Sequence, residues 1–257
     1  MSDRMTQNRK IGEKDFALII PAYNEGESIG GLIEETRGVY PTVKIIVISD
    51  GSVDNTASTA RELGATVLDL PCNLGVGGAV QAGMRYACEE GYDVVVRIDG
   101  DGQHAPAEIH KLLEAMVQTG ADLVTGSRFL GNGEFHGGTK MRQAGNVMLS
   151  WFLSLICRAR VTDPTCGFWC VRGDLLKYFS QYYPSEYPEP EALALLRRQG
   201  YEMVEVPVSV RPRKFGTSTI DSFGTVYFAL RVGLSLLADR VRPADKRFAK
   251  KSKKKEP

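Results

Sequence analysis

Short apolar runs alternate with helical stretches along the first half of the chain. The runs predict strands at residues 16–20, 43–49, 65–70, 94–98 and 122–125, and the stretches between them predict helices at 27–39, 54–63, 79–90 and 107–119. Strands buried on both faces of a sheet consist of continuous apolar runs of this kind. The alternation predicts an α/β fold with a mostly parallel, Rossmann-like sheet flanked by helices.

Polar clusters follow the first four predicted strands, at the point where each strand ends. They are Tyr23-Asn24-Glu25, Asp50-Gly51-Ser52, Asn73 to Gly78, and Asp99 to His104. Ligands of open parallel sheets bind outside the carboxyl ends of the strands. Four polar loops at one edge therefore favour a nucleotide-type site over four solvated turns.

The glycine-rich stretch from Gly75 to Gly78 has two interpretations. It lacks the G-x-G-x-x-G spacing, and no Walker lysine follows it, so a P-loop ATPase is disfavoured. It is either a tight strand-to-helix turn or a place where the backbone and the helix amides approach a phosphate.

Asp99 and Asp101 are separated by a single glycine. Two carboxylates this close repel each other unless a proton or a cation lies between them. A hard divalent cation that also binds phosphate oxygens suits this pair, whereas an isolated Asp-x-Asp is more often a solvated turn. The three other polar loops favour the metal.

Cysteine usage and charge narrow the class of protein further. The chain has five cysteines without a CxxC pair and only three histidines, which disfavours a zinc site and fits reduced, cytosolic thiols. Residues 1–15 are polar, so we expect no signal peptide.

Residues 240–257 carry nine basic and two acidic side chains, a net charge of +7, which leaves a net charge of −6 for the rest of the chain. This distribution disfavours nucleic acid as a partner and indicates a tail that seeks an anionic surface.

Seven short motifs together make the chain resemble family 2 glycosyltransferases of the GT-A fold, in the branch of the polyprenyl-phosphate sugar synthases. The resemblance covers about residues 16–220. The motifs are P-x-Y-N-E (21–25), D-G-S-x-D (50–54), N-x-G-x-G-G (73–78), D-x-D-x-Q-H (99–104), G-S-R (126–128), D-P-T-x-G-F (163–168) and R-x-x-G-x-S (213–218).

The resemblance implies a metal-dependent hexosyltransferase and assigns roles to individual residues. The nucleotide-sugar, GDP-mannose or a UDP-hexose, would bind at Pro21, Ala22, Tyr23, Glu25, Asp50, Gly75, Gly78, Asp99 and Gly100. Mg²⁺ or Mn²⁺ would bind at Asp99, Asp101 and Gln103. The acceptor phosphate would bind at Arg128, Arg142, Arg213 and Ser218. The catalytic residues would be Asp99, Asp101, Asp163 and Glu191.

Some positions depart from the family pattern. Ser49 replaces an aspartate, Gly100 and Gly102 flank Asp101 where alanine and leucine are usual, and Glu189 stands where glutamine is common. These departures leave the base and the sugar open. His104 is either a third metal ligand or a ring stacked near the site.

The acceptor decides which chemistry the site needs. The second pKa of a phosphate monoester is near 6, so a phosphate acceptor is mostly a dianion at neutral pH and requires positioning arginines rather than a base. A hydroxyl acceptor would require a carboxylate base, for which Asp163 and Glu191 are candidates. Each has a structural alternative, Asp163 as a loop hydrogen-bond partner and Glu191 as a first-turn helix charge.

Sequence alone predicts four segments: a disordered N-terminus (1–15), the catalytic domain (16–220), an amphipathic interfacial helix (221–240) and a basic disordered tail (241–257). The apolar stretch 147–157 is too short to span a bilayer and predicts a buried or interface-touching helix. The C-terminal helix would lie on the cytoplasmic face of the membrane. Alternatively, it packs on the body, on a membrane-protein partner or in a homodimer.

Three other functions remain open. They are transfer to a glycan or soluble hydroxyl, nucleotidyl transfer, and nucleotide-sugar binding without catalysis. The three arginines favour a phosphate acceptor, and the Asp99/Asp101 pair favours catalysis. The stretch Pro21 to Glu25 lacks the glycine-rich loop and basic residue that a nucleotidyltransferase would need.

Overall fold

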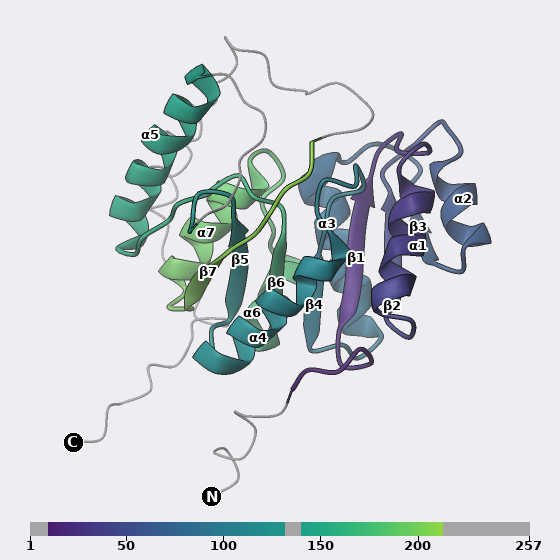
Figure 1. Cartoon of the computed structure of the whole chain (residues 1–257), viewed down its shortest axis with the longest axis horizontal. Coiled ribbons are helices and arrows are strands. Elements are labelled where there is room, and N and C mark those ends of the chain that lie inside the picture. The colour runs from purple at the N-terminus through teal and green to yellow at the C-terminus, as the bar shows by residue number, and fades with distance from the viewer. Residues whose placement is uncertain (1–9, 132–139, 213–257) are drawn as a thin grey trace, which may run out of the picture.

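The structure is a computed structural model that describes residues 10–131 and 140–212, the latter range without the side chains of 140–144 (Figure 1). Its described strands form a single mixed sheet in the order β3-β2-β1-β4-β6-β5-β7. The strands are β1 (Ala17–Ala22), β2 (Lys44–Ser49), β3 (Thr66–Asp69), β4 (Val94–Arg97), β5 (Leu123–Ser127), β6 (Trp169–Arg172) and β7 (Met203–Pro207).

All strand pairs are parallel except those of β6. β1 pairs in parallel with β2 and β4, β2 with β3, and β5 with β7. β6 lies between β4 and β5 and is antiparallel to both. The carboxyl ends of β1 to β4 therefore meet at one edge of the sheet, which confirms the predicted α/β class.

Helices cover both faces of the sheet (Figure 1). One core contains α1 (Ile29–Val39), α2 (Thr56–Glu62) and α4 (Ile109–Thr119), and the core on the other face contains α3 (Gly75–Glu89), α6 (Gly173–Gln181) and α7 (Pro188–Arg198). Helix α5 (Lys140–Cys157) joins the second core by packing on α7. Strand β1 shows how the two cores share one strand. Ile19 points into the core of α3, whereas Leu18 and Ile20 point into the core of α1, because successive side chains alternate between faces.

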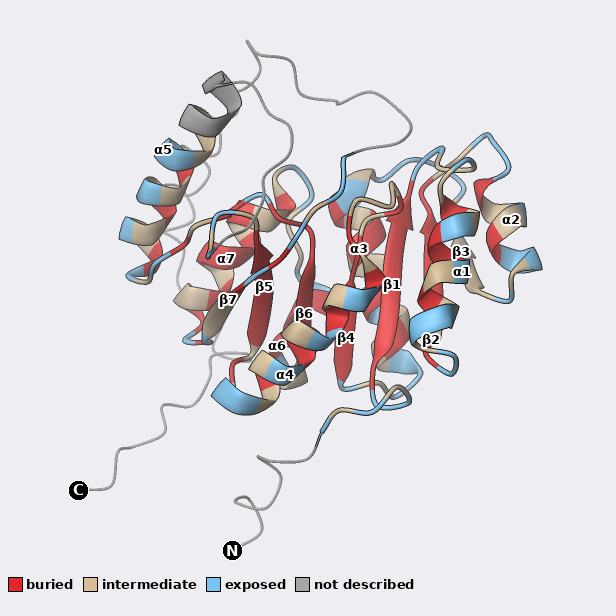
Figure 2. Ribbon diagram, in the orientation of Figure 1, coloured by how far each residue is buried: buried red, intermediate tan, exposed pale blue. Residues whose placement is uncertain are grey.

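This double burial explains why the strands were recognisable as apolar runs. Ile19, Ile46 and Ile48 are fully buried, and removing each such side chain from water contributes roughly 1.5–3 kcal/mol. Figure 2 shows β1, β4, β5 and β6 as buried strands among half-exposed helices.

The first half of the chain agrees with the predicted elements to within a few residues. The helix expected at 107–119 begins with a 3₁₀ turn at Pro106–Glu108, with the proline in its first turn. The glycine-rich stretch belongs to α3, which begins at Gly75 and has φ +77° there. The helix predicted before β3 begins at Thr56, whose backbone N–H donates to the Asp54 carboxylate.

Some predicted segments differ from the structure or lie beyond it. Residues 10–15, expected to be disordered, form a turn in which Glu13 accepts hydrogen bonds from the backbone N–H and hydroxyl of Thr42. Residues 1–9 and 132–139, Arg213, Ser218, the helix predicted at 221–240 and the tail at 241–257 lie outside the described residues.

Candidate active site

A cavity of about 990 Å³ opens at the carboxyl edge of β1 to β4. Its size is at the upper end for ligand sites. It is lined by eight of the nine residues predicted to bind the nucleotide-sugar: Pro21, Ala22, Tyr23, Glu25, Asp50, Gly75, Asp99 and Gly100. Asp50 shapes the wall by accepting a hydrogen bond of 2.7 Å from the backbone N–H of Leu74. The loops after four strands thus converge as expected.

Gly78, the ninth predicted residue, does not line this cavity. A Cβ at Gly78 would lie 2.6 Å from the Cβ of Leu74, so the glycine allows the start of α3 to pack. Gly77 has a similar packing role, because a Cβ there would approach the carbonyl oxygen of Pro184. Of the glycines in this stretch, Gly75 lines the cavity beside Val76, whereas Gly77 and Gly78 serve close packing.

Arg97 is a cavity residue that sequence reasoning missed. Its side chain is 2% exposed, and it donates to Asp99 Oδ1 at 2.9 and 3.2 Å and to Glu189 Oε1 at 2.8 Å. Its guanidinium also lies over the Trp169 ring, 5.6 Å from the centroid. Burial lowers the pKa of Arg97, but the charges of Asp99 and Glu189 more than offset this and raise that pKa above its ordinary value. The signal was a charged residue inside the apolar run before the two aspartates.

Asp99 and Asp101 have different surroundings. Arg97 compensates the Asp99 charge, whereas Asp101 Oδ1 accepts a hydrogen bond of 3.0 Å from the backbone N–H of Gln103. In the described part of the chain, no three His, Cys, Asp or Glu side chains gather as a metal site. Carboxylate oxygens are nevertheless the donors that Mg²⁺ and Mn²⁺ prefer, and such sites are commonly completed by substrate phosphates. The residues present therefore fit a cation that is bound together with a diphosphate.

Gln103 and His104 are held by the chain itself. The side-chain amide of Gln103 donates to the Arg211 carbonyl at 3.1 Å, and the Arg211 N–H donates to the Gln103 carbonyl at 2.9 Å. The Nδ1 atom of His104 accepts from the backbone N–H of Asp99 at 3.3 Å, and its ring stacks on Phe168 at 5.1 Å. The ring of His104 is thus stacked near the site, and its role as a third metal ligand stays a prediction.

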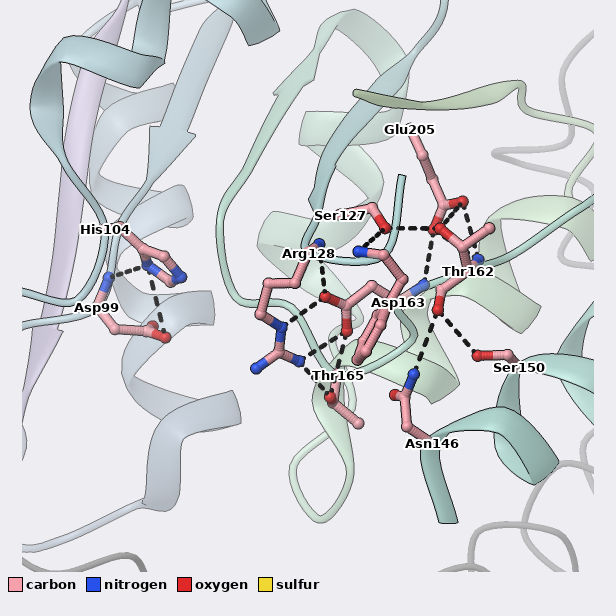
Figure 3. Close-up of polar contacts among 11 residues, drawn as sticks. Asp99, His104, Ser127, Arg128, Asn146, Ser150, Thr162, Asp163, Thr165 and Glu205 are labelled. Atoms are coloured by element: carbon pink, nitrogen blue, oxygen red, sulfur yellow. Dashed lines mark hydrogen bonds and ion pairs between the residues drawn. The ribbon is translucent and has the colours of Figure 1, made fainter. Parts of the chain in front are cut away.

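A second cluster lies beyond β5, around Arg128 and Asp163 (Figure 3). The Arg128 guanidinium donates to Asp163 through Nε at 2.6 Å and Nη2 at 2.7 Å, and the Arg128 backbone N–H donates to the same carboxylate at 3.1 Å. The Asp163 side chain is 0% exposed and that of Arg128 is 18% exposed. Burial lowers the pKa of Arg128, but the hydrogen bonds and charge of Asp163 raise that pKa above its ordinary value.

The remaining predicted residues are only partly placed. Glu191 lies in the first turn of α7, half-buried and outside the cavity lining. Arg142 belongs to α5, but its side chain is not described. The described chain ends at Pro212, next to the contact between Arg211 and Gln103 and one residue before Arg213.

This fold and cavity define an α/β protein with a candidate ligand site beside paired carboxylates at the carboxyl edge of its sheet. Residues 17–178 match the model of glycosyl transferase family 2. The chain belongs to this family, which confirms the resemblance seen in its motifs.

Relatives and solved structures agree with this assignment. The chain is 35% identical to an undecaprenyl-phosphate mannosyltransferase of Micrococcus luteus, over 78% of this chain and 85% of the relative. It is 29% identical to a UDP-N-acetylglucosamine–dolichyl-phosphate N-acetylglucosaminyltransferase of Methanococcus voltae, over 89% of this chain and 100% of the relative. Glucosyl-3-phosphoglycerate synthase of Mycobacterium tuberculosis, solved with Mn²⁺ and UDP, superposes with a TM-score of 0.65 at 20% identity, over 91% of this chain and 82% of that one. The last likeness confirms the GT-A fold.

Proposed function

We propose that this glycosyltransferase moves a sugar from a nucleotide-diphosphate sugar to a polyprenyl phosphate at a membrane surface, with inversion at the anomeric carbon. The observation that carries the proposal is the Arg128–Asp163 pair. Both carboxylate oxygens of Asp163 bind the Arg128 guanidinium, and the Asp163 side chain is fully buried. Asp163 is therefore placed to orient Arg128 rather than to accept a proton from a substrate. The names of the relatives from Micrococcus luteus and Methanococcus voltae support a polyprenyl-phosphate acceptor.

The donor would occupy the cavity at the carboxyl edge of β1 to β4. Its base and ribose would bind between the loop at Tyr23 and Asp50, and its diphosphate would lie toward Asp99 and Asp101. Asp101, with Asp99 nearby, would hold Mg²⁺ or Mn²⁺. When bound, such an ion neutralises charge on the departing diphosphate. Arg97 keeps the Asp99 carboxylate in place, because its buried guanidinium donates twice to one Asp99 oxygen.

The acceptor would be activated by positioning alone. Its phosphate, largely a dianion at neutral pH, approaches the anomeric carbon from the face opposite the diphosphate. The bond from a phosphate oxygen to that carbon forms as the bond to the nucleoside diphosphate breaks, and no proton has to be removed. Arginine forks hold a phosphate in this way, and Arg128 already lies in a fixed orientation.

A hydroxyl acceptor fits these contacts less well. It would need a carboxylate free to take a proton, and the two candidates are poorly placed for that task. Asp163 binds Arg128 with both oxygens, and Glu191 lies outside the cavity lining. We therefore place transfer to a glycan or soluble hydroxyl second.

We place the protein peripherally on the cytoplasmic face of a membrane, and helix α5 supports the peripheral position. Val147, Trp151 and Leu155 recur at four-residue spacing along it and are 62–67% exposed. Arg158 and Arg160 follow the helix and are also exposed. An apolar stripe with a tryptophan and flanking arginines is typical of helices that lie in a lipid interface. Among the helices of the described ranges, none is long and apolar enough to cross a bilayer.

An organic-phase transfer assay tests the proposal. Purified protein is incubated with polyprenyl phosphate, labelled UDP-N-acetylglucosamine, UDP-glucose or GDP-mannose, and Mn²⁺ or Mg²⁺. We expect label in the lipid phase with at least one donor, its loss on chelation, and its return with added metal. Asp101→Asn should abolish transfer, while Asp174→Asn, which neutralises an exposed carboxylate at the opposite sheet edge, should not. Lack of transfer with every donor, or full activity of Asp101→Asn, would refute the proposal.

A further inference from the structure

Glu205 lies on β7, an edge strand, and binds the segment that carries Asp163 (Figure 3). Its two carboxylate oxygens accept from the backbone N–H of Thr162 at 2.8 and 2.9 Å. They also accept from the Thr162 hydroxyl at 2.9 Å and from the backbone N–H of Asp163 at 3.1 Å. One carboxylate thus satisfies two consecutive backbone donors just before the side chain that orients Arg128.

Thr162 is held by three further side chains, which come from β5 and α5. Its hydroxyl lies 2.6 Å from the Ser127 hydroxyl at the end of β5, and its carbonyl accepts from Ser150 at 3.0 Å and Asn146 at 3.3 Å, both on α5. The backbone N–H, the hydroxyl and the carbonyl of Thr162 are therefore all engaged. We call Thr162, Glu205, Ser127, Asn146 and Ser150 the Thr162 junction.

This junction determines where Asp163 lies, and Asp163 determines where Arg128 lies. Ser127, which contacts Thr162, directly precedes Arg128, so the arginine is constrained both through its own backbone and through its guanidinium. We propose that Glu205 is a positioning residue for the acceptor: it fixes the Thr162–Asp163 backbone and thereby the direction in which Arg128 presents its N–H groups. This inference rests on the proposed function, because it takes the ligand of Arg128 to be the acceptor phosphate.

The chemistry of the contact explains why a carboxylate is required. Hydrogen bonds from N–H donors to an ionised carboxylate are about twice as strong as neutral ones. A glutamine at position 205 would offer one acceptor oxygen, and its NH₂ group would face another N–H donor. The backbone at Thr162 and Asp163 would have to move, and a misplacement of about 1 Å in a catalytic arrangement can lower the rate about 10²-fold.

Helix α5 extends the junction to the molecular surface. Asn146 and Ser150 face Thr162, while Val147 and Trp151, one residue further along the same helix, are exposed. The backbone that positions Arg128 is therefore hydrogen-bonded to the helix whose outer side carries the apolar stripe. This arrangement suits an acceptor whose phosphate enters the site while its hydrocarbon chain stays at the lipid surface.

The test compares Glu205→Gln with Glu202→Gln, which neutralises an exposed carboxylate on the residue directly before β7. Three quantities are measured on the full chain: the Arg128 Nε–H NMR cross-peak, assigned by its loss in Arg128→Lys; the Kd for the nucleoside diphosphate with Mn²⁺; and KM for polyprenyl phosphate. For Glu205→Gln we expect a shifted or exchange-broadened cross-peak, an unchanged Kd, and a KM raised about 10- to 100-fold. Glu202→Gln should match the wild type in all three.

Each outcome has a defined meaning. An unchanged cross-peak in Glu205→Gln overturns the positioning role. A shifted cross-peak with unchanged acceptor KM leaves Glu205 as a positioning residue but contradicts the binding of the acceptor phosphate by Arg128, and hence the proposed function. If Glu205→Gln does not fold, Thr162→Val replaces it, because this variant removes only the hydroxyl contacts to Glu205 and Ser127. A wild-type cross-peak in Thr162→Val would then overturn the inference.

Discussion

Gly167 lies against the carboxylate of Asp99, although the two residues are far apart in the sequence. A Cβ at Gly167 would lie 2.5 Å from Asp99 Oδ2 and 2.9 Å from both Asp99 Oδ1 and Arg97 Nη2. Ordinary contact begins at 3.4 Å, so in Gly167→Ala the nearer oxygen would have to withdraw by about 0.9 Å. Arg97 is fully buried behind Asp99 and leaves little room for such a movement.

The expected effect follows from this displacement. A shift of about 1 Å in a catalytic group can cost about 10²-fold in rate, or about 2.7 kcal/mol of transition-state stabilisation. Overpacking of a buried site also lowers the free energy of unfolding by about 1–3 kcal/mol. We therefore expect Gly167→Ala to lower kcat/KM about 100-fold, with a modestly reduced Tm.

Steady-state transfer is measured at varied donor concentration and well below the Tm of each variant. This separates the loss of catalytic rate from the loss of stability. Gly31→Ala is the matched control: nothing lies within 4 Å of its Cβ position on α1, and a helical glycine-to-alanine change stabilises by roughly 0.5–1 kcal/mol. A folded Gly167→Ala protein with wild-type kcat/KM would show that the position of the Asp99 carboxylate does not limit transfer.

Three further predictions concern the surface. Trp151→Glu should weaken binding to anionic vesicles at least about tenfold, because it replaces a large exposed apolar side chain with a charge; equal flotation of both proteins would contradict this. Iodoacetamide at pH 8 should label exposed Cys72 quickly and spare Cys157, since burial raises the pKa of the Cys157 thiol to about 11; mass spectrometry showing a second fast thiol would refute it. Arg211→Glu should lower the rate of transfer several-fold, because it breaks the two 2.7 Å contacts of Arg211 with Glu35. Adding Glu35→Arg should restore part of the lost rate; a double variant no more active than Arg211→Glu would contradict a role of this ion pair.

The part of the fold that sequence could predict is the part in which local pattern and tertiary structure agree. β1 and β2 are buried on both faces, and turn residues follow them directly, so their apolar runs predicted strands to within a few residues. β6 and β7 were not predicted. β6 has only four residues, and its position between β4 and β5 depends on pairings with strands distant in the sequence, which no local pattern specifies.

The same distinction applies to the site. Tyr23, Asp50 and Asp99 were found because each follows a strand, and the rule about strand ends places them together. Arg97 was missed because its partner Glu189 is 92 residues away, and without that partner it resembles an ordinary residue at a strand end. Glu205 was missed because a glutamate on an edge strand normally faces solvent, and only the folded chain brings Thr162 to it.

The reversal of β6 explains how the carboxylates after β4 and the arginine after β5 come to share one segment of chain. β4 and β5 end at the same edge of the sheet, and β6 begins there because it runs in the opposite direction. The segment that precedes β6 therefore reaches the ends of both neighbours, with Asp163 binding Arg128 after β5 and Gly167 packing on Asp99 after β4. With a parallel β6, this segment would lie at the other edge, and neither contact could form. One antiparallel strand thus gives a mostly parallel sheet a shared wall between its carboxylates and its arginine. Under the proposed function, a single short segment, 163–167, would align the two substrates.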